Sequence, residues 1–519
     1  MSLFNVVNDQ AQFDAASNVS SDVHGAGIRF TQAGAARVTT TAGTFFNQGI
    51  PMSDSGQVAI VDATAGLPAD TTYLNGLPIS GNKVCVSRNA SSVVSNGLPF
   101  DSNGAIAGAI NFDLNFIGTD TLDPQVTFTR ASTATRFDQN GVLQTVASGV
   151  ARSNNNQDYD PVTLAPRGFL VEEQRTNLLT YSAQFDNAAW QKINSTINAN
   201  VGVSPDGTAN ADKLEETAVT NFFAVVQNPT AAFSTTYTWS CFAKAAERNQ
   251  ITVNFSAITN VAAIFNLVTG AVVTQGAGIT SASGTSVGNG WFRFSITFTT
   301  PSSGLNLLYH VVGPSVNGNP TYAGVAGFGI LIWGAQLEAG AFPTSYIPTT
   351  TTALTRAADV ASVNTLSPWY NSVEGTLYGE FAVAGYAPTS SFSIPAVLSD
   401  NTNNNVISVA NTNTGANLYS YGEINTGGVS QAGFYGASGL SFGVGSVRKS
   451  AIAYAANNFA FTTQGAAVQT DTSGTVPTVS RLYVGVGATG GSLFLNGYLR
   501  RVSYYPTRLS NAQLQAITA

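Results

Sequence analysis

The sequence has 519 residues and a formal net charge of −7, and only 9% of its residues are charged, where soluble domains average about 25%. With 44% hydrophobic residues, the composition excludes wholesale disorder, and the scarcity of Glu, Lys and Arg excludes a mainly helical protein, because those residues cover exposed helix faces. The abundant small polar and β-branched residues favour strands and turns, so we expect a mainly β fold.

The charge pattern and the rare residue types exclude several functions. No basic stripe is present for nucleic-acid binding, and no apolar run reaches the roughly 18 residues of a membrane-spanning helix. The first residues lack the pattern of a secretory signal, so we expect synthesis in the cytoplasm without secretion. Two cysteines, Cys85 and Cys241, and two histidines, His24 and His310, are too few for a disulfide framework or a zinc site. We therefore expect neither a metal nor a cofactor.

The first 110 residues contain a short repeat. Gly-x-Pro triplets at 49–51, 76–78 and 97–99 are each followed by a polar turn and a β-like run. Such small units cannot bury a core alone, so they stack on their neighbours or on other copies of the chain. We predict a β-repeat arm over residues 1–110 that oligomerises as a trimer; a loop-rich arm with coincidental turns is the alternative. The β-like runs are 57–61, 83–87 and 105–107.

A first β-sandwich is predicted over residues 111–348. From residue 169 onward strand signals recur about every ten residues, which is the spacing of a sandwich. In the clearest strand, 291–298, the phenylalanines and Ile296 alternate with polar residues, so the two sets face opposite ways. The glycine-rich residues 270–290 are expected to form a long connection. The polar set of the strand is Arg293, Ser295 and Thr297.

A second sandwich is predicted over residues 349–519, beyond a Thr/Pro-rich linker at 343–355. Its strand signals run from residue 375 to 505, and the chain then ends in one short helix, 510–517, with Ser510 as its N-cap. The predicted fold class is thus mainly β: an N-terminal β-repeat arm followed by two antiparallel β-sandwich (jelly-roll) domains.

Two motifs resemble the ends of a module that is common in bacteriophage structural proteins. The first is GFLVEEQRTNLL at 168–179, and the second is WGAQLEAG at 333–340, followed by TSYIPT at 344–349. The resemblance covers residues 128–348 and implies a jelly roll of the carbohydrate-binding-module type.

The C-terminal part resembles a concanavalin-A-like (laminin-G-like) sandwich. The matching pieces are GTLY at 375–378, LYVG at 482–485 and LFLNGY at 493–498. Together the two resemblances imply a bacteriophage virion protein, either a fibre or a capsid decoration protein, rather than a cellular lectin.

Two glutamate doublets, 172–173 and 215–216, raise the question of a glycosidase. Hydrolysis needs two carboxylates about 5–9.5 Å apart across one bond, and adjacent strand residues point to opposite faces, so neither doublet alone forms such a pair. We expect no catalytic residue. Glu172 and Glu338 are interpreted as buried structural acids, with Arg175 suggested as a partner for such an acid.

Two further patterns have plain structural interpretations. The G-x-x-G-x-G shape at 324–329 has no strand–helix context, so a β-turn is preferred to a phosphate loop. Asp359, and Asp400 with Asn401 and Asn403, could offer oxygen ligands to Ca²⁺, but the second string lacks the Gly and terminal Glu of an EF-hand loop. A polar loop is the preferred interpretation.

Aromatic side chains are the candidate ligand-binding residues, because sugars stack their apolar face on Trp and Tyr. Trp190, Trp369, Tyr370 and Tyr419 lie in turn-like surroundings and are predicted to be exposed, with structural packing as the alternative for each. Trp239, Trp291 and Trp333 lie within apolar strand runs and are expected in the core.

The predicted function is that of a non-enzymatic structural protein of a phage virion, a capsid-attached head fibre or a tail fibre, which projects glycan-adhesive sandwiches from the particle surface. Expected partners are capsid or tail proteins bound through the arm, further copies in a homotrimer, and a host surface glycan held by avidity. Neither nucleic acid nor membrane is expected as a partner. A polysaccharide-degrading tailspike and a purely structural capsid decoration protein without a ligand are the alternatives.

Overall fold

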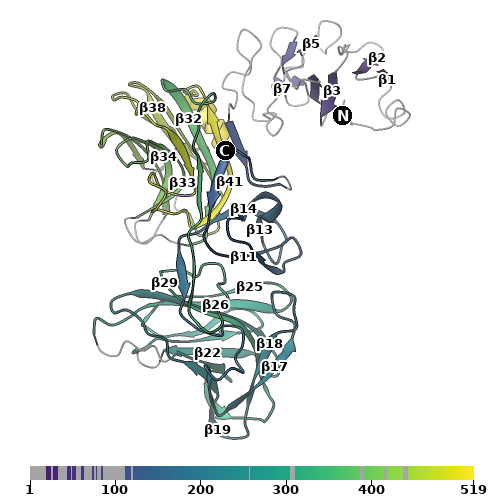
Figure 1. Cartoon of the computed structure of the whole chain (residues 1–519), viewed down its shortest axis with the longest axis vertical. Helices are drawn as coiled ribbons and strands as arrows, with labels where there is room; N and C mark the ends of the chain where they lie inside the picture. The colour runs from purple at the N-terminus through teal and green to yellow at the C-terminus, as the bar shows by residue number, and fades with distance from the viewer. Residues whose placement is uncertain are drawn as a thin grey trace.

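Two β-sandwiches contain most of the described chain, and Figure 1 shows one above the other. The computed structural model describes residues 112–118, 121–255, 258–303, 310–385, 391–413, 418–435 and 442–519, together with the backbone of short strands between residues 19 and 85. Strand pairs within the sandwiches are antiparallel, which confirms the predicted mainly β fold class.

The lower sandwich of Figure 1, here called the inserted sandwich, packs two six-stranded sheets. The first sheet runs β16 (Gln191–Ile193), β20 (Ala224–Gln227), β27 (His310–Pro314), β22 (Gln250–Phe255), β23 (Ala262–Asn266) and β24 (Val272–Gln275). The second runs β17 (Ser195–Gly202), β18 (Ala211–Glu216), β29 (Gly329–Ala339), β21 (Thr236–Ala245), β26 (Trp291–Thr299) and β25 (Ile279–Ser286). A short pair, β19 (Thr220–Phe222) with β28 (Thr321–Ala323), lies at its far end.

Alternation along β26 decides which side chains enter the core of the inserted sandwich. Phe294 and Ile296 are fully buried between the sheets, while Arg293 and Ser295 lie on the opposite face, as predicted.

The prediction of a long connection over 270–290 was wrong. β24 and β25 form there because pairing with β23 and β26 supplies backbone hydrogen bonds that compensate for weak strand propensity. The three tryptophans expected in the core, Trp239, Trp291 and Trp333, are buried.

The upper sandwich of Figure 1 is here called the base sandwich. Its seven-stranded sheet runs β10 (Val126–Thr129), β31 (Val360–Val363), β40 (Arg481–Val484), β33 (Phe392–Ser399), β34 (Val406–Asn413), β35 (Leu418–Thr426) and β36 (Val429–Tyr435). The facing sheet runs β13 (Asp158–Tyr159), β14 (Pro166–Val171), β41 (Gly497–Tyr505), β32 (Glu374–Val383), β37 (Arg448–Ala455), β38 (Phe459–Thr463) and β39 (Gln469–Asp471), and β9 (Phe112–Asn115) also pairs with β41.

Two separate stretches of chain build the base sandwich. β10 pairs with β31, and both β14 and β9 pair with β41, so these three strands of the N-terminal side belong to the sheets of the C-terminal part. The chain leaves along β15 (Arg175–Asn177) and returns along its partner β30 (Leu354–Arg356). The pairing therefore corrects the boundaries predicted at 111 and 348: one sandwich is inserted into the other. Strand signals show where strands form, but not which distant strand completes each ladder.

The C-terminal helix forms as the sequence predicts. α2 spans Asn511–Thr518, and the Ser510 hydroxyl accepts a hydrogen bond from the Gln513 main-chain N–H at 3.3 Å. The Gln513 side chain in turn accepts one from the Ser510 N–H at 2.8 Å, which completes a capping box. Leu514 and Ile517 are buried against β37 and β38.

The remaining elements are short. A hairpin, β11 (Ala134–Phe137) with β12 (Leu143–Val146), and a 3₁₀ turn, η1 (Asn154–Asn156), precede β13. In the N-terminal arm β5 (Ile60–Asp62) pairs with β8 (Lys83–Cys85), so the predicted runs 57–61 and 83–87 each overlap one of two paired strands. The predicted run 105–107 lies outside the described residues. The arm's role in trimerisation and docking stays a prediction. Its strands are β1 (Val19–His24), β2 (Gly27–Gln32), β3 (Thr44–Asn47), β4 (Ile50–Ser53), β5 (Ile60–Asp62), β6 (Tyr73–Leu74), β7 (Leu77–Pro78) and β8 (Lys83–Cys85).

In the part of the chain that the structure describes, no helix is long and apolar enough to cross a membrane.

Cys241 is a buried free thiol, and burial raises its pKa to about 12. The side chain of Cys85 lies outside the described residues. Cys241 therefore behaves as a core residue rather than a reactive one.

Candidate functional site

The two tryptophans named as candidate ligand-binding residues are buried, so their predicted exposure was wrong and the alternative of structural packing holds. Trp190 is 1% exposed, packs 4.8 Å from the ring of Phe185, and donates its indole N–H to the Tyr181 carbonyl at 3.0 Å. Trp369 is 4% exposed and stacks on Phe112 with 4.3 Å between ring centroids. Both lie in irregular segments that fold over the edge of a core, and turn-like sequence surroundings do not reveal such coverage.

The two tyrosines lie in different environments. Tyr370 is half-buried, and its ring packs 5.6 Å from that of Tyr504, so it belongs to the core wall of the base sandwich. Tyr419 is half-buried on β35, opposite Thr412 of β34. Because side chains alternate along a strand, Tyr419 shares a sheet face with Tyr421. Of the four predicted residues, only Tyr419 lies on the face described next.

A groove of about 250 Å³ lies over β33, β34 and β35 of the base sandwich. A side chain at Gly422 would collide with Phe461 of β38 in the facing sheet, so position 422 points inward. Its neighbours Tyr421 and Glu423 therefore lie on the opposite face of β35 from Gly422, where Tyr421 is 8% exposed. We call this site the sheet-face groove; its lining includes Phe392, Ile394, Ser408, Tyr421, Glu423, Asn425 and Leu493.

Aromatic rings form a row along the groove. The Tyr421 ring lies 5.1 Å from Phe392 on one side and 5.1 Å from Tyr435 on the other. Tyr435, on the edge strand β36, is 64% exposed. Three strands thus contribute one ring each. Tyr421 is 8% exposed and lies between the half-buried Phe392 and the open Tyr435, which stands at the sheet edge outside the groove lining.

Glu423 is the charged group of the groove. Its neighbours across the sheet are Ser408 on β34 and Gly433 on β36, both too small to cover the carboxylate. Oε1 accepts a hydrogen bond from Asn425 Nδ2 at 3.1 Å, and no described basic residue forms an ion pair with it. Burial together with the charge of Glu423 raises the pKa of Tyr421, so the phenol stays protonated as a donor. The arrangement can bind hydroxyl groups.

Alternation along β35 was the missed signal for this site. Tyr419, Tyr421, Glu423 and Asn425 occur at every second position, so a strand places all four on one face. Tyr419 was predicted from its turn-like surroundings, whereas Tyr421, Glu423 and Asn425, which line the groove, were not predicted.

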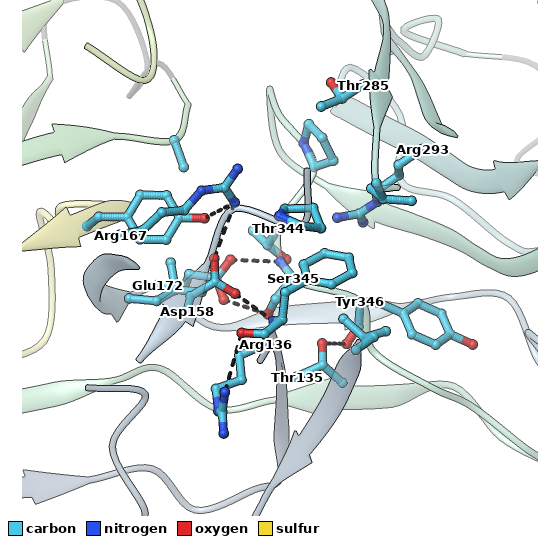
Figure 2. A pocket seen from close by; sticks show the side chains of 18 of the residues that line it. Thr135, Arg136, Asp158, Arg167, Glu172, Thr285, Arg293, Thr344, Ser345 and Tyr346 are labelled. Atoms are coloured by element: carbon cyan, nitrogen blue, oxygen red, sulfur yellow. Dashed lines mark hydrogen bonds and ion pairs between the residues drawn. The ribbon is translucent and has the colours of Figure 1, made fainter. Parts of the chain in front are cut away.

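Glu172 is held at the junction between the sandwiches, shown in Figure 2. Its carboxylate accepts hydrogen bonds from the Ser345 N–H at 2.7 Å and the Ser345 hydroxyl at 2.6 Å, and it pairs with Arg152 at 2.8 Å. Burial alone would raise its pKa, but Arg356 and Arg152, with Ser345, hold the pKa of Glu172 well below its usual range. These contacts are structural, as expected for this acid.

Arg175, suggested as a partner for a buried acid of these motifs, pairs with Glu173 at 2.5 Å, whereas Glu172 pairs with Arg152 and Arg356. Glu338 is fully buried and accepts hydrogen bonds from the Thr344 N–H at 2.9 Å and from the Gln336 amide at 2.6 Å. It therefore has the buried structural placement that was expected.

The second glutamate doublet is also engaged in structural contacts. Glu216 pairs with Arg248 at 2.5 Å and accepts a hydrogen bond from the Val325 N–H at 2.9 Å. Val325 in turn accepts from the Phe328 N–H at 3.0 Å, which makes 324–329 a turn, as predicted. Glu215 lies 3.5 Å from Lys213.

The proposed calcium ligands are satisfied within the protein. Asp400 accepts hydrogen bonds from the Thr402 N–H at 2.9 Å and from the Asn405 amide at 2.7 Å, which closes a polar loop. Asp359 pairs with Arg130 at 3.0 Å. Across the described ranges, no three or more His, Cys, Asp or Glu residues are grouped so that they could hold a metal ion.

No protein-family model and no curated protein matches the sequence. Among solved structures, the chain is similar to the NanB sialidase from Streptococcus pneumoniae, with 16% identity and a TM-score of 0.25 over 30% of this chain and 26% of that one. It is also similar to the CBM40 of the Ruminococcus gnavus IT-sialidase (15% identity, TM-score 0.23, 29% of this chain and 84% of that one). A third is mouse laminin alpha1 chain, domains LG4-5 (12% identity, TM-score 0.19, 56% and 85%). These values assign neither a family nor an activity to the chain.

Proposed function

We propose that this chain is a non-enzymatic adhesive protein that binds glycans in the sheet-face groove. The observation that carries the proposal is the placement of the Glu423 carboxylate beside a row of aromatic rings on the outer face of a sheet. A sugar ring has an apolar C–H face and a rim of hydroxyls. The rings of Tyr421 and Phe392 can cover the apolar face, while Glu423 and Asn425 can accept from and donate to the hydroxyls.

The charge content of the groove supports binding rather than hydrolysis. Glu423 is the only carboxylate among the described residues that line it. Glycoside hydrolysis uses two carboxylates that flank the scissile bond. A single acid beside aromatic rings suits recognition, since it can hold hydroxyl groups but has no second acid to complete a reaction.

We also propose that the chain is carried on the surface of a bacteriophage particle, as a trimeric head fibre or tail fibre. The support is the resemblance of residues 168–179 and 333–349 to a module of phage structural proteins. The N-terminal arm would dock on capsid or tail proteins, and many copies would convert weak single-site binding into avidity. Cryo-electron microscopy of purified particles should show density for this chain on the capsid or the tail. Its absence from the particles would overturn this part of the proposal.

Glycan binding should depend on Glu423. We expect Glu423→Gln to weaken binding to the strongest ligand from a host-glycan array by about tenfold or more, because hydrogen bonds to a charged group contribute about 1.5–3 kcal/mol each. Tyr421→Ala should weaken it similarly through lost stacking. Affinities are measured by surface plasmon resonance on the full chain.

Glu247→Gln is the matched control, because Glu247 lies on the inserted sandwich with 39% of its side chain exposed. It should bind like the wild type. Equal affinities of the Glu423 and Glu247 variants would contradict the proposal, and a wild type that binds no host glycan would favour a decoration protein. Release of reducing ends from host polysaccharide would instead favour a tailspike.

A further inference from the structure

A second cavity, of about 180 Å³, lies between the two sandwiches, and we call it the junction pocket. One wall is the outer face of β25 and β26, and the other is formed near β13, β14 and β41. The segment Pro343–Tyr346 crosses between the walls, with Thr344 and Ser345 in the centre of Figure 2. The pocket belongs to neither sandwich alone and shares no lining residue with the sheet-face groove.

Hydroxyl groups cover the wall that the inserted sandwich provides. Ser295 and Arg293 alternate on the outer face of β26, opposite Ser283 and Thr285 on β25. The hydroxyls of Ser283 and Ser295 lie 3.0 Å apart. Each hydroxyl can both donate and accept, so this wall suits a ligand that is itself rich in hydroxyl groups.

Arg293 is the unusual group in this wall. It is half-buried, Nη2 donates to the Ser240 hydroxyl at 2.9 Å, and its buried Nε has no hydrogen-bond partner. None of the ion pairs among the described residues includes it. Burial lowers the pKa of Arg293, which means that its charge is poorly solvated. By contrast, Arg167 on the opposite wall pairs with Asp158 at 3.2 Å and with Asp160 at 2.8 Å.

The charges around the pocket favour a ligand with one negative charge. Three arginines line the pocket, Arg136, Arg167 and Arg293, with two carboxylates, Asp158 and Glu172. Asp158 and Asp160 neutralise Arg167, and Arg152 and Arg356 neutralise Glu172. Arg293 forms no ion pair among the described residues, and a single guanidinium matches a monoanion better than a dianion such as phosphate. Arg136 Nη1 donates to two main-chain carbonyls, so this guanidinium is already engaged within the protein. Arg293 is the guanidinium on the hydroxyl-rich wall.

We propose that the junction pocket binds a monosaccharide that carries a carboxylate, such as a hexuronic acid, with Arg293 pairing with that carboxylate. An arginine fork binds a carboxylate through two parallel hydrogen bonds, and the serine and threonine hydroxyls can bind the ring substituents. A cavity of about 150 Å³ holds one benzene ring, so a pocket of about 180 Å³ has room for one ring rather than an extended chain. This site is separate from the proposed function of the sheet-face groove.

The test is isothermal titration of the intact chain with sodium D-glucuronate, D-glucose and inorganic phosphate. We expect D-glucuronate to bind at least tenfold more tightly than D-glucose or phosphate. Arg293→Gln should lower the affinity for D-glucuronate about tenfold or more, because it removes the cation and keeps a planar polar group. Arg293→Lys, which keeps the charge and protects folding, should bind with intermediate affinity because the fork is lost.

Arg508→Gln is the matched control, since the Arg508 guanidinium also forms no ion pair with a carboxylate among the described residues and it lies outside the pocket lining. It should bind D-glucuronate like the wild type, as should Glu423→Gln. Equal binding of D-glucose and D-glucuronate, phosphate binding as tight as that of D-glucuronate, or an unchanged affinity in both Arg293 variants would each overturn the proposal. If Glu423→Gln loses glycan binding in the sheet-face groove, D-glucuronate binding in the junction pocket should not change, so each proposal can fail without the other.

Discussion

Asp359→Ala should lower the free energy of unfolding of the base sandwich by about 3–5 kcal/mol, because it leaves buried arginines without their counter-charge. Asp359 has no exposed side-chain surface and pairs with Arg130 at 3.0 Å and with Arg152 at 2.5 Å. It also accepts a hydrogen bond from the main-chain N–H of Glu172 at 2.9 Å. The carboxylate thus joins three segments at the point where the chain crosses between the sandwiches. Urea denaturation followed by tryptophan fluorescence measures the loss.

Glu247→Gln provides the exposed comparison for this result. Glu247 pairs with Lys213 at 2.9 Å but is 39% exposed, so its replacement should change stability by less than about 1 kcal/mol. If Asp359→Ala does not fold, Asp359→Asn keeps the side-chain shape and allows the same measurement. A loss below about 1 kcal/mol in the asparagine variant would show that the cluster does not hold the junction.

Trp190→Ala should destabilise the inserted sandwich by about 3–5 kcal/mol, the usual cost of removing a buried large aromatic side chain. Trp190 fills the core beside Phe185 and satisfies the Tyr181 carbonyl with its indole N–H. The folded fraction of the variant should still bind glycan, since Trp190 lies in the other sandwich from the groove. Thermal unfolding and the glycan-binding assay, run on the same preparation, separate the two effects.

Tyr435→Ala is the control for the stability measurement, because it also removes an aromatic ring but one that is 64% exposed. Its stability should stay within about 0.5 kcal/mol of the wild type. A Trp190→Ala variant that keeps full stability but loses glycan binding would instead support the original prediction that this tryptophan contacts the ligand.

The candidate sites were only partly predictable from sequence. The polar face of 291–298 was predicted correctly, and it forms one wall of the junction pocket. That this face would be covered by Pro343–Tyr346 was not predictable, because the covering segment follows β29, which pairs with β18 and β21 rather than with β26. The groove differs, because β33, β34 and β35 are consecutive in the chain and neighbours in the sheet, and only the segment that brings Gly487, Ala488 and Leu493 to its lining comes from farther along the chain.

Patterns within short stretches of sequence were enough to predict the local structure of this protein. Low charge and β-branched residues favour strands, period-two alternation separates Arg293 from Phe294, and Ser510 with Gln513 starts the last helix. These features depend on neighbours a few residues apart. Long-range packing alone places β10 and β14 in the sheets of the distant C-terminal part, buries Trp190 and Trp369, and brings Leu493 to the groove beside Tyr421. Strand partners and burial follow from which remote surfaces exclude water together, and no local pattern specifies that choice.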